Sequence, residues 1–344
     1  MPTVFADLGD HQATGVAVSQ SNRVFVSFPR WSDDVPLSVA EVGNDGILVP
    51  YPTAAWNAFQ LGNTKEIATQ FVCVQSITVD ADDHLWILDP ASPNLAGVIP
   101  HGPKLVEVDL ATDRVLRSIA FSPEVAPTFS YLNDVRIDTR EHAAYITDSG
   151  LGGIIVVDLS GSRARRVLGD HVSAKAEEMF LPDVNGVPVK AIDGTPLRVH
   201  SDGIALSRDG STLYYHALSG RTLYKIATLD LRDVSLPADM LAARVSPVAH
   251  TAAADGLEID PRGRLFITNI ESSAISMLDT RASDGTTTLV AQSPLLDWPD
   301  SIAIAPDGAL LVTASQIERM PRFAGFEKRS HSYQLLRIVL PTDP

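Results

Sequence analysis

Six short polar residues stand at equivalent positions of the chain, each immediately before a five-residue segment with apolar residues at alternate places. They are Thr14, Gln75, Asn133, Asp202, Asp255 and Asp300. A short polar side chain ordinarily caps the turn that leads into a strand, but capping does not require aspartate at three successive positions. Carboxylates about 6 Å apart would repel by roughly 3 kcal/mol per pair at an effective dielectric constant of about 20. The pattern therefore indicates a bound cation, a basic ligand, or a carboxyl group with a raised pKa.

The oxygen atoms of this set suit a hard metal ion. Asn133, Asp202, Asp255 and Asp300 supply amide and carboxylate oxygens, and no cysteine or paired histidine joins them. Calcium and magnesium prefer oxygen ligands, whereas zinc prefers nitrogen and sulfur. These four residues are the predicted metal ligands, and calcium or a similar divalent cation is the predicted cofactor. A metal-free set of turn caps is the alternative.

Histidine is the usual proton carrier at neutral pH, and two histidines are expected near the same rim. His216 closes the second strand of the fourth repeat, and His200 lies two residues before Asp202. We predict His216, His200 and Asp202 as catalytic residues, with structural roles for the histidines as the alternative. The predicted ligand contacts, from the same rim, are Gln75, Asp148, Arg30, Trp298 and Tyr131. The sequence has no G-x-S-x-G or H-E-x-x-H motif, so Ser-triad hydrolysis and zinc proteolysis lack support.

The elements that must position these residues form an internal repeat. The six units begin at Gly15, Ser76, Asp134, Gly203, Gly256 and Ser301, and consecutive starts are 45 to 69 residues apart. Each unit has an alternating segment, a turn and a second strand, and most have a third strand. Such a repeat is typical of propeller blades, and a β-sandwich would not explain six similar units. The sequence predicts an all-β fold, a six-bladed β-propeller in a single domain spanning residues 1–344.

The first residues of the chain are expected to close the ring. Residues 3–8 precede the first unit without a partner of their own, and only one further strand, near residues 333–340, follows the sixth unit's first two. We predict that residues 3–8 form the outer strand of the last blade. The longest inserts, which are expected to carry aromatic residues over the polar floor, are 52–74, 90–103, 171–200 and 316–332.

The net charge and the lengths of the apolar runs limit the kinds of partner that the chain is expected to bind. With 27 basic and 42 acidic residues the formal charge is −15, which disfavours nucleic acid and anionic lipid. No apolar run approaches the roughly 18 residues of a membrane span, so the expected partner is a small-molecule substrate or ligand. The one cysteine, Cys73, lies in an apolar run and is expected to be buried. The first residues lack a signal-peptide pattern, which predicts a cytoplasmic protein as the sequence stands and a secreted or periplasmic one if a signal peptide was removed. The oligomeric state is left open.

Six stretches of the chain carry a resemblance to a known family. They are GVAVSQSNRVFVSFPRW (15–31), VPYPTAAWN (49–57), FVCVQSITVDADDHLWILDP (71–90), YLNDVRIDTREHAAYITDSGLGG (131–153), DGIALSRDGSTLYYHALSGRTLY (202–224) and WPDSIAIAPDGALLVTASQI (298–317). These stretches resemble the Yellow/major royal jelly protein family. The resemblance implies a six-bladed propeller. Insect members include proteins associated with dopachrome conversion and salivary proteins that bind biogenic amines in the channel. Those members are usually secreted and carry disulfides, so this chain, with one cysteine, is expected to be a bacterial member.

More distantly, the repeat is similar to calcium-dependent lactonases of the gluconolactonase and paraoxonase type. This similarity implies a metal at the channel floor, and Asn133, Asp202 and Asp255 match its ligand positions by blade count. Thr14 stands where a gluconolactonase has a glutamate ligand. One hypothesis is an enzyme that acts on a small cyclic metabolite, by metal-assisted lactone hydrolysis or by isomerisation. The other is a non-catalytic protein that binds an amine between aspartates and aromatic rings.

Overall fold

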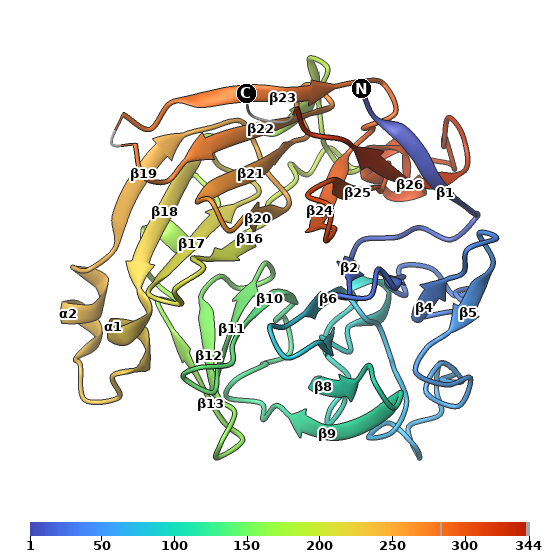
Figure 1. Ribbon diagram of the computed structural model, residues 1–344, viewed down its shortest axis with the longest axis horizontal. Coiled ribbons are helices and arrows are strands. Elements are labelled where there is room, and N and C mark those ends of the chain that lie inside the picture. The colour runs from blue at the N-terminus through green and yellow to red at the C-terminus, as the bar shows by residue number, and fades with distance from the viewer. Residues whose placement is uncertain (283, 342–344) are drawn as a thin grey trace.

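Six antiparallel four-stranded sheets form a ring in the computed structural model, which describes residues 1–282 and 284–341. Figure 1 shows the six sheets, the blades, around a common centre, with one strand of each blade innermost. The prediction of a six-bladed β-propeller is confirmed. Among the described residues, no helix has the length and apolar character needed to cross a membrane.

The first three blades run from inner to outer strand along the chain. Blade 1 contains β2 (Val16–Val18), β3 (Val24–Ser27), β4 (Val39–Val42) and β5 (Leu48–Pro50). Blade 2 contains β6 (Ser76–Val79), β7 (His84–Asp89), β8 (Lys104–Asp109) and β9 (Arg114–Ala120). Blade 3 contains β10 (Leu132–Asp138), β11 (Ala143–Asp148), β12 (Ile154–Asp158) and β13 (Arg163–Val167).

The next two blades follow the same order, and blade 6 ends on the first strand of the chain. Blade 4 contains β16 (Ser201–Leu206), β17 (Thr212–Ala217), β18 (Thr222–Ala227) and β19 (Ser246–His250). Blade 5 contains β20 (Leu257–Ile259), β21 (Arg264–Asn269), β22 (Ala274–Asp279) and β23 (Thr287–Gln292). Blade 6 contains β24 (Pro299–Ile304), β25 (Leu310–Ala314), β26 (Tyr333–Ile338) and β1 (Thr3–Gly9).

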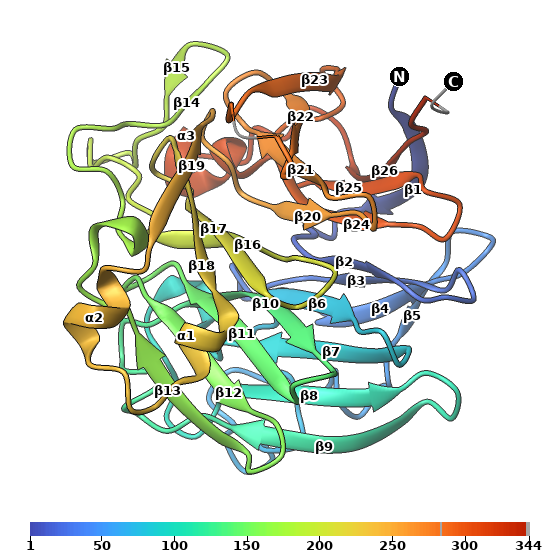
Figure 2. The ribbon, with the colours of Figure 1, turned by 60° about the vertical axis from the view of Figure 1, so that its left-hand side comes forward.

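Short elements lie in the connections. They are η1 (Pro93–Leu95), η2 (Val172–Ala174), the hairpin of β14 (Asp183–Val184) and β15 (Val187–Pro188), α1 (Thr228–Arg232), α2 (Ala238–Ala242), η3 (Ile317–Arg319) and α3 (Pro321–Ala324). Figure 2 shows α3 and the β14–β15 hairpin at the same end of the propeller. The two inserts touch, because Ile192 N donates a hydrogen bond of 3.1 Å to Arg322 O.

The hydrophobic core lies between the blades. Side chains alternate across each strand, so a middle strand is buried on both faces: in β7, Leu85 and Ile87 pack on blade 1, whereas Trp86 and Leu88 pack on blade 3. Equivalent clusters fill all of the remaining interfaces between neighbouring blades. Each blade therefore depends on two neighbours, and the ring must close to bury the last apolar face.

Strand β1 closes the ring as predicted. It pairs antiparallel with β26, from Thr3 opposite Arg337 to Gly9 opposite Tyr333. Its buried residues Ala6 and Leu8 join the cluster between blades 6 and 1. The first and last strands, β1 and β26, thus share one sheet.

Hydroxyl groups latch neighbouring blades where the inner strands begin. Thr147 Oγ1 accepts from Asp134 N (3.1 Å) and donates to Asp202 O of the next blade (2.5 Å). Ser27 and Thr313 make the same two bonds at equivalent positions, and Thr313 joins blade 6 to Thr14 O of blade 1 (2.7 Å). These bonds fix the backbone of the residues that enter the inner strands.

Candidate functional site

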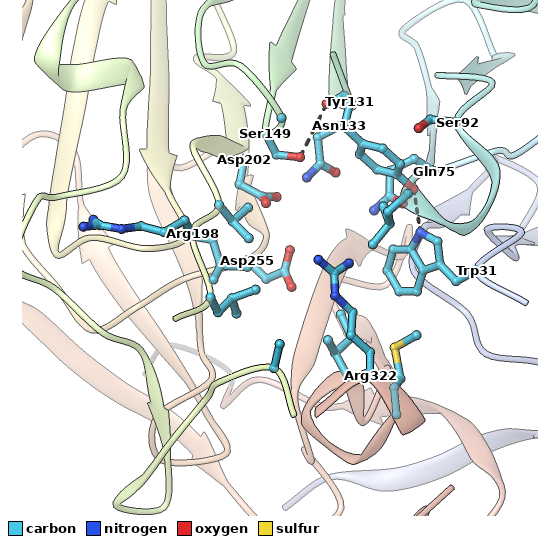
Figure 3. Close-up of a pocket in the computed structure, with 18 of the residues that line it drawn as sticks. Trp31, Gln75, Ser92, Tyr131, Asn133, Ser149, Arg198, Asp202, Asp255 and Arg322 are labelled. Atoms are coloured by element: carbon cyan, nitrogen blue, oxygen red, sulfur yellow. Dashed lines mark hydrogen bonds between the residues drawn. The ribbon is translucent and has the colours of Figure 1, made fainter. Parts of the chain in front are cut away.

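A cavity of about 360 Å³ opens at the end of the channel where the inner strands begin. Five of the six polar residues of the repeat line its floor: Gln75, Asn133, Asp202, Asp255 and Asp300. The sixth, Thr14, is buried beside them and donates a hydrogen bond of 2.7 Å to Gln75 O. The circular arrangement therefore brings together carboxyl groups that are far apart in the sequence (Figure 3).

Local irregularities at the start of the inner strands position these side chains. The register shifts between Leu132 and Val135, between Ser201 and Ile204, and between Pro299 and Ile302, so the floor residues of blades 3, 4 and 6 lie in bulges. A bulge redirects a side chain that regular pleating would place elsewhere. Close contact between blades needs glycine as well: a Cβ on Gly256 would lie 2.1 Å from Asp300 O.

Burial raises the pKa values of all three floor aspartates. Burial and then repulsion from Asp255 raise the pKa of Asp202 well above its usual value, and the same two causes raise the pKa of Asp300. Burial raises the pKa of Asp255 to about 7, and a hydrogen bond from Trp298 opposes the increase. Burial and the charge of Asp255 therefore favour the protonated forms of Asp202 and Asp300, whereas Asp255 titrates near pH 7.

Aromatic side chains form the wall of the cavity. Trp31 Nε1 donates to Tyr131 Oη (2.7 Å), and Tyr131 Oη donates to Gln75 Oε1 (2.8 Å). Burial raises the pKa of Tyr131 well above its usual value, so the phenol stays neutral and continues to donate. Trp298, with 1% of its surface exposed, lines the same cavity and donates to Asp255 Oδ2 (2.7 Å). The wall thus combines flat apolar surface with a fixed set of hydrogen bonds.

The roof comes from the insert between β25 and β26. Ile317 of η3, Arg322 and Phe323 of α3, and Met320 between the two helices all line the cavity. The guanidinium of Arg322 points toward the aspartates (Figure 3). The cavity consequently has an acidic floor and a cationic group above it.

The structure does not bring the two predicted histidines into the cavity. His216 is fully buried, its Nε2 lies 2.8 Å from Thr251 Oγ1, and burial lowers its pKa to about 4. In the second strand of its blade, His216 occupies the position at which other blades have the hydroxyl residues Ser27, Thr147 and Thr313, which bond to the next blade. His200 Nδ1 accepts a hydrogen bond of 2.9 Å from Ala176 N, and burial lowers its pKa. Both imidazoles are neutral at pH 7, and neither is among the residues that line the cavity.

Two predicted ligand contacts hold loops instead of facing the cavity. The buried carboxylate of Asp148 accepts from Ser130 Oγ (2.6 Å), from the backbone N–H of Tyr131 (3.0 Å) and from Arg166. Arg30 is buried and donates to Val72 O (3.2 Å) and Phe59 O (3.4 Å). Asp148 therefore supports the wall by holding the backbone of Tyr131, and Arg30 anchors the insert 52–74.

Asp134 lies beside the floor, and Arg198 and Arg322 line the cavity; none of these three residues was predicted as part of the site. Asp134 follows Asn133 in β10 and is buried, and burial raises its pKa. Glycine or serine begins the other five repeat units, so the aspartate at this position was the sequence signal that could have marked Asp134. Arg322 lies in the insert 316–332, which was expected to cover the rim. Nothing in the repeat marks an individual residue of that insert.

The four metal ligands predicted from the sequence all belong to the floor of the cavity. The oxygens of Asn133, Asp202, Asp255 and Asp300 are the type that calcium prefers. Among the described residues, the one group of His, Cys, Asp or Glu ligand atoms that all lie within 4.8 Å of one another is Asp80, His84 and Glu107 in blade 2, away from the cavity. That group is already bonded internally and to Trp86 and Arg117. The floor thus has oxygen atoms of the type that binds calcium, but some of these atoms, such as Asp255 Oδ2 and Asp300 Oδ2, already accept hydrogen bonds within the protein.

Curated relatives with similar sequences include insect proteins. A dopaminechrome tautomerase from Drosophila melanogaster is 22% identical over 321 residues, which cover 83% of this chain and 65% of that protein. Protein Yellow from Drosophila subobscura is 24% identical over 69% of this chain and 44% of its own length. Major royal jelly protein 5 from Apis mellifera is 28% identical over 59% of this chain and 34% of its own length. The match spans less than two-thirds of each of these relatives.

Solved structures share the fold at low identity. A gluconolactonase from Xanthomonas campestris superposes with a TM-score of 0.58 and 15% identity, over 99% of this chain and 89% of the other. A streptogramin B lyase gives a TM-score of 0.56 and 10% identity, over 99% of this chain and 98% of the other. These likenesses concern the fold alone. Residues 72–337, most of the propeller, match the profile described as Major royal jelly protein, and the chain belongs to the major royal jelly protein family.

Proposed function

We propose that this protein catalyses an isomerisation, in which a proton moves within a small conjugated ring compound. The observation that carries the proposal is the group of buried aspartates at the cavity floor, in which, beyond the effect of burial, the hydrogen bond between Asp202 and Asp255 raises the pKa of Asp202 and lowers that of Asp255, so that the two values are moved apart. Paired acid and base catalysis requires such a difference between neighbouring carboxyl groups. The aromatic wall suits a flat ring.

Asp255 is the proposed general base and Asp202 the proposed general acid. Asp255, with a pKa of about 7, is available as a carboxylate and takes a proton from a carbon of the substrate. The electron pair of that C–H bond moves through the conjugated system, and Asp202 donates its proton to the oxygen or nitrogen at the far end. The hydrogen bond between Asp202 and Asp255 returns the proton and resets the pair. The product has the same atoms as the substrate, and nothing is oxidised or reduced.

The name of one relative supports this reaction class. The Drosophila melanogaster protein that matches 83% of this chain is called a dopaminechrome tautomerase, and tautomerisation is a proton shift of this kind. The gluconolactonase and lyase likenesses support only the propeller framework.

The test measures the decay of dopaminechrome absorbance with and without purified protein. The wild type should accelerate the decay, and Asp255→Asn and Asp202→Asn should each lower the rate by about 10²- to 10⁴-fold, the usual contribution of a general acid or base. Asp209→Asn is the control, because Asp209 is exposed in the turn after β16. A wild type no faster than buffer, or aspartate variants as fast as the wild type, would refute the proposal.

Metal-assisted hydrolysis of a cyclic ester is the second candidate, favoured by the oxygen-only donor set of the floor. Calcium bound by Asn133, Asp202, Asp255 and Asp300 would polarise a carbonyl group and activate water. Elemental analysis after equilibration with calcium, together with thermal unfolding in EDTA, tests this candidate. Bound calcium that Asp255→Asn removes would favour hydrolysis over proton transfer. Binding of dopamine without any turnover would instead indicate an amine-binding protein.

A further inference from the structure

Arg322 stands out among the charged residues of the cavity because its guanidinium has no hydrogen bond or ion pair with the described part of the chain. Its guanidinium carbon lies 5.6 Å from the Phe323 ring, and its backbone carbonyl is held by Ile192 N. The residue is exposed and lines the cavity. The guanidinium interacts electrostatically with the exposed Asp193 without a hydrogen bond to it, so the backbone is fixed while the charged group remains available to a ligand.

A second arginine of the cavity shows the contrast. Arg198 also lines the cavity, but its guanidinium donates to the carbonyl oxygens of Glu177 (2.6 Å) and Glu178. Figure 3 shows Arg198 directed away from the floor and Arg322 directed toward it. Arg322 is thus the cation that a molecule in the cavity would meet.

The arrangement of charge limits what Arg322 can bind. One guanidinium presents a planar pair of donors that matches a carboxylate. The three aspartates below would repel a dianion such as a phosphate ester more strongly than a monoanion. The aromatic side chains of Trp31, Tyr131 and Trp298 line the same cavity as the cation and the acidic floor, and their flat surfaces suit a ring.

We propose that Arg322 anchors a carboxylate of the substrate, so that the ligand class of this cavity is a flat ring compound with a carboxylate at one edge and the reacting atoms at the other. The inference rests on the proposed function for the orientation of the ligand. The carboxylate edge of the ring lies toward α3, and the reacting edge lies toward Asp202 and Asp255. Arg322 would then determine specificity by selecting acids over their decarboxylated analogues.

The binding test compares two probes that differ only in this group, indole-2-carboxylate and indole, by isothermal titration at pH 7. The wild type should bind the acid at least about tenfold more tightly than indole, the scale of one charge-assisted hydrogen-bonded pair. Arg322→Gln should remove that preference and leave the binding of indole within about twofold. Lys328→Gln is the matched control, because Lys328 is an exposed cation of the same insert that does not line the cavity.

Each outcome decides one of the two proposals. Equal binding of the two probes by the wild type, binding of neither, or loss of the preference in Lys328→Gln overturns the role of Arg322. A kinetic arm uses dopachrome, which carries a carboxylate, and dopaminechrome, which lacks one. There, Arg322→Gln should raise KM for dopachrome by about tenfold or more and change kcat little. If the wild type accelerates neither reaction but still prefers indole-2-carboxylate, the isomerase proposal fails and the carboxylate anchor stands.

Discussion

Trp298 Nε1 donates a hydrogen bond of 2.7 Å to Asp255 Oδ2, across the boundary between blades 6 and 5. Trp298 adopts a positive φ of 56°, which is uncommon for a bulky residue. Its indole is buried, so the bond is shielded from water. This contact lowers the pKa of Asp255 against the effect of burial, and so adjusts the carboxyl group that we propose as the general base.

The Trp298 contact leads to a prediction about pH dependence. Trp298→Phe removes the donor and keeps the ring, so the pKa of Asp255 should rise above about 7. Activity at pH 7 should fall because a smaller fraction of Asp255 is ionised, and it should recover as the pH is raised. The measurement is kcat/KM from pH 5 to 9. Trp86→Phe is the control, because Trp86 makes the same 2.7 Å bond to Asp80 away from the cavity; a shift in that variant but not in Trp298→Phe would contradict the assignment.

Asp255 should also make folding stability depend on pH. Its pKa is about 7 in the folded state and near 3.8 when unfolded. A carboxyl group with a raised folded pKa stabilises the fold below the unfolded pKa, and this contribution is lost as the pH rises through the folded pKa. Asp255→Asn should therefore be more stable than the wild type at pH 8, by on the order of 1–4 kcal/mol, with little gain at pH 4.

Urea unfolding at the two pH values measures this difference. Asp260→Asn is a useful comparison, because Asp260 pairs with Arg264 at 2.7 Å in a turn of the same blade. That variant should be less stable at pH 8. A loss of stability in Asp255→Asn at pH 8 would mean that the floor carboxylate is compensated by a bound cation.

The ring of floor residues could be predicted from the sequence because it follows from the repeat. Once six similar units close around an axis, residues at the same place in each unit must meet, and Asn133, Asp202, Asp255 and Asp300 do so. The position of a single residue within a strand is harder to infer. His216 lies in a strand that leads to the rim, but its side chain contacts Thr251 instead of lining the cavity. Successive side chains of a strand point to opposite faces, so a shift of one residue decides which way a side chain points.

The inserts could not be read in the same way. The conformation of a loop depends on contacts with other loops and not on a periodic pattern. Arg322 reaches the cavity because α3 is held against the insert 171–200 through Ile192, and no spacing in the sequence encodes that contact. Asp148 was expected to meet a ligand because it ends a strand at the rim, but the backbone N–H groups of the following turn, at Gly150 and Leu151, occupy its carboxylate.

The hydrogen bonds of Thr313 between blades 6 and 1 lead to a prediction about the stability of the closed ring. Thr313→Val removes the hydrogen bonds that join its hydroxyl to the partly buried Ser301 N and to the buried Thr14 O. The loss should cost about 1–3 kcal/mol of unfolding free energy, the usual penalty for an unsatisfied buried group. Chemical denaturation measures it. Thr313→Ser, which keeps the hydroxyl, should retain most of the stability, and equal losses in the two variants would show that the methyl group and not the hydroxyl matters.

Strand β1 offers the sharpest test of how the ring is closed. Leu8 is 1% exposed between blades 6 and 1, whereas Val4 on the same strand is 48% exposed. Leu8→Ala should lower the unfolding free energy by about 2–4 kcal/mol, as for other buried leucines, and Val4→Ala by less than about 0.5 kcal/mol. Deletion of residues 1–9 should lower the melting temperature of the whole protein in one cooperative transition, because blade 6 loses its outer strand and blade 1 loses a neighbour. Unchanged melting in the deletion variant would mean that five complete blades and an incomplete sixth hold the ring without β1.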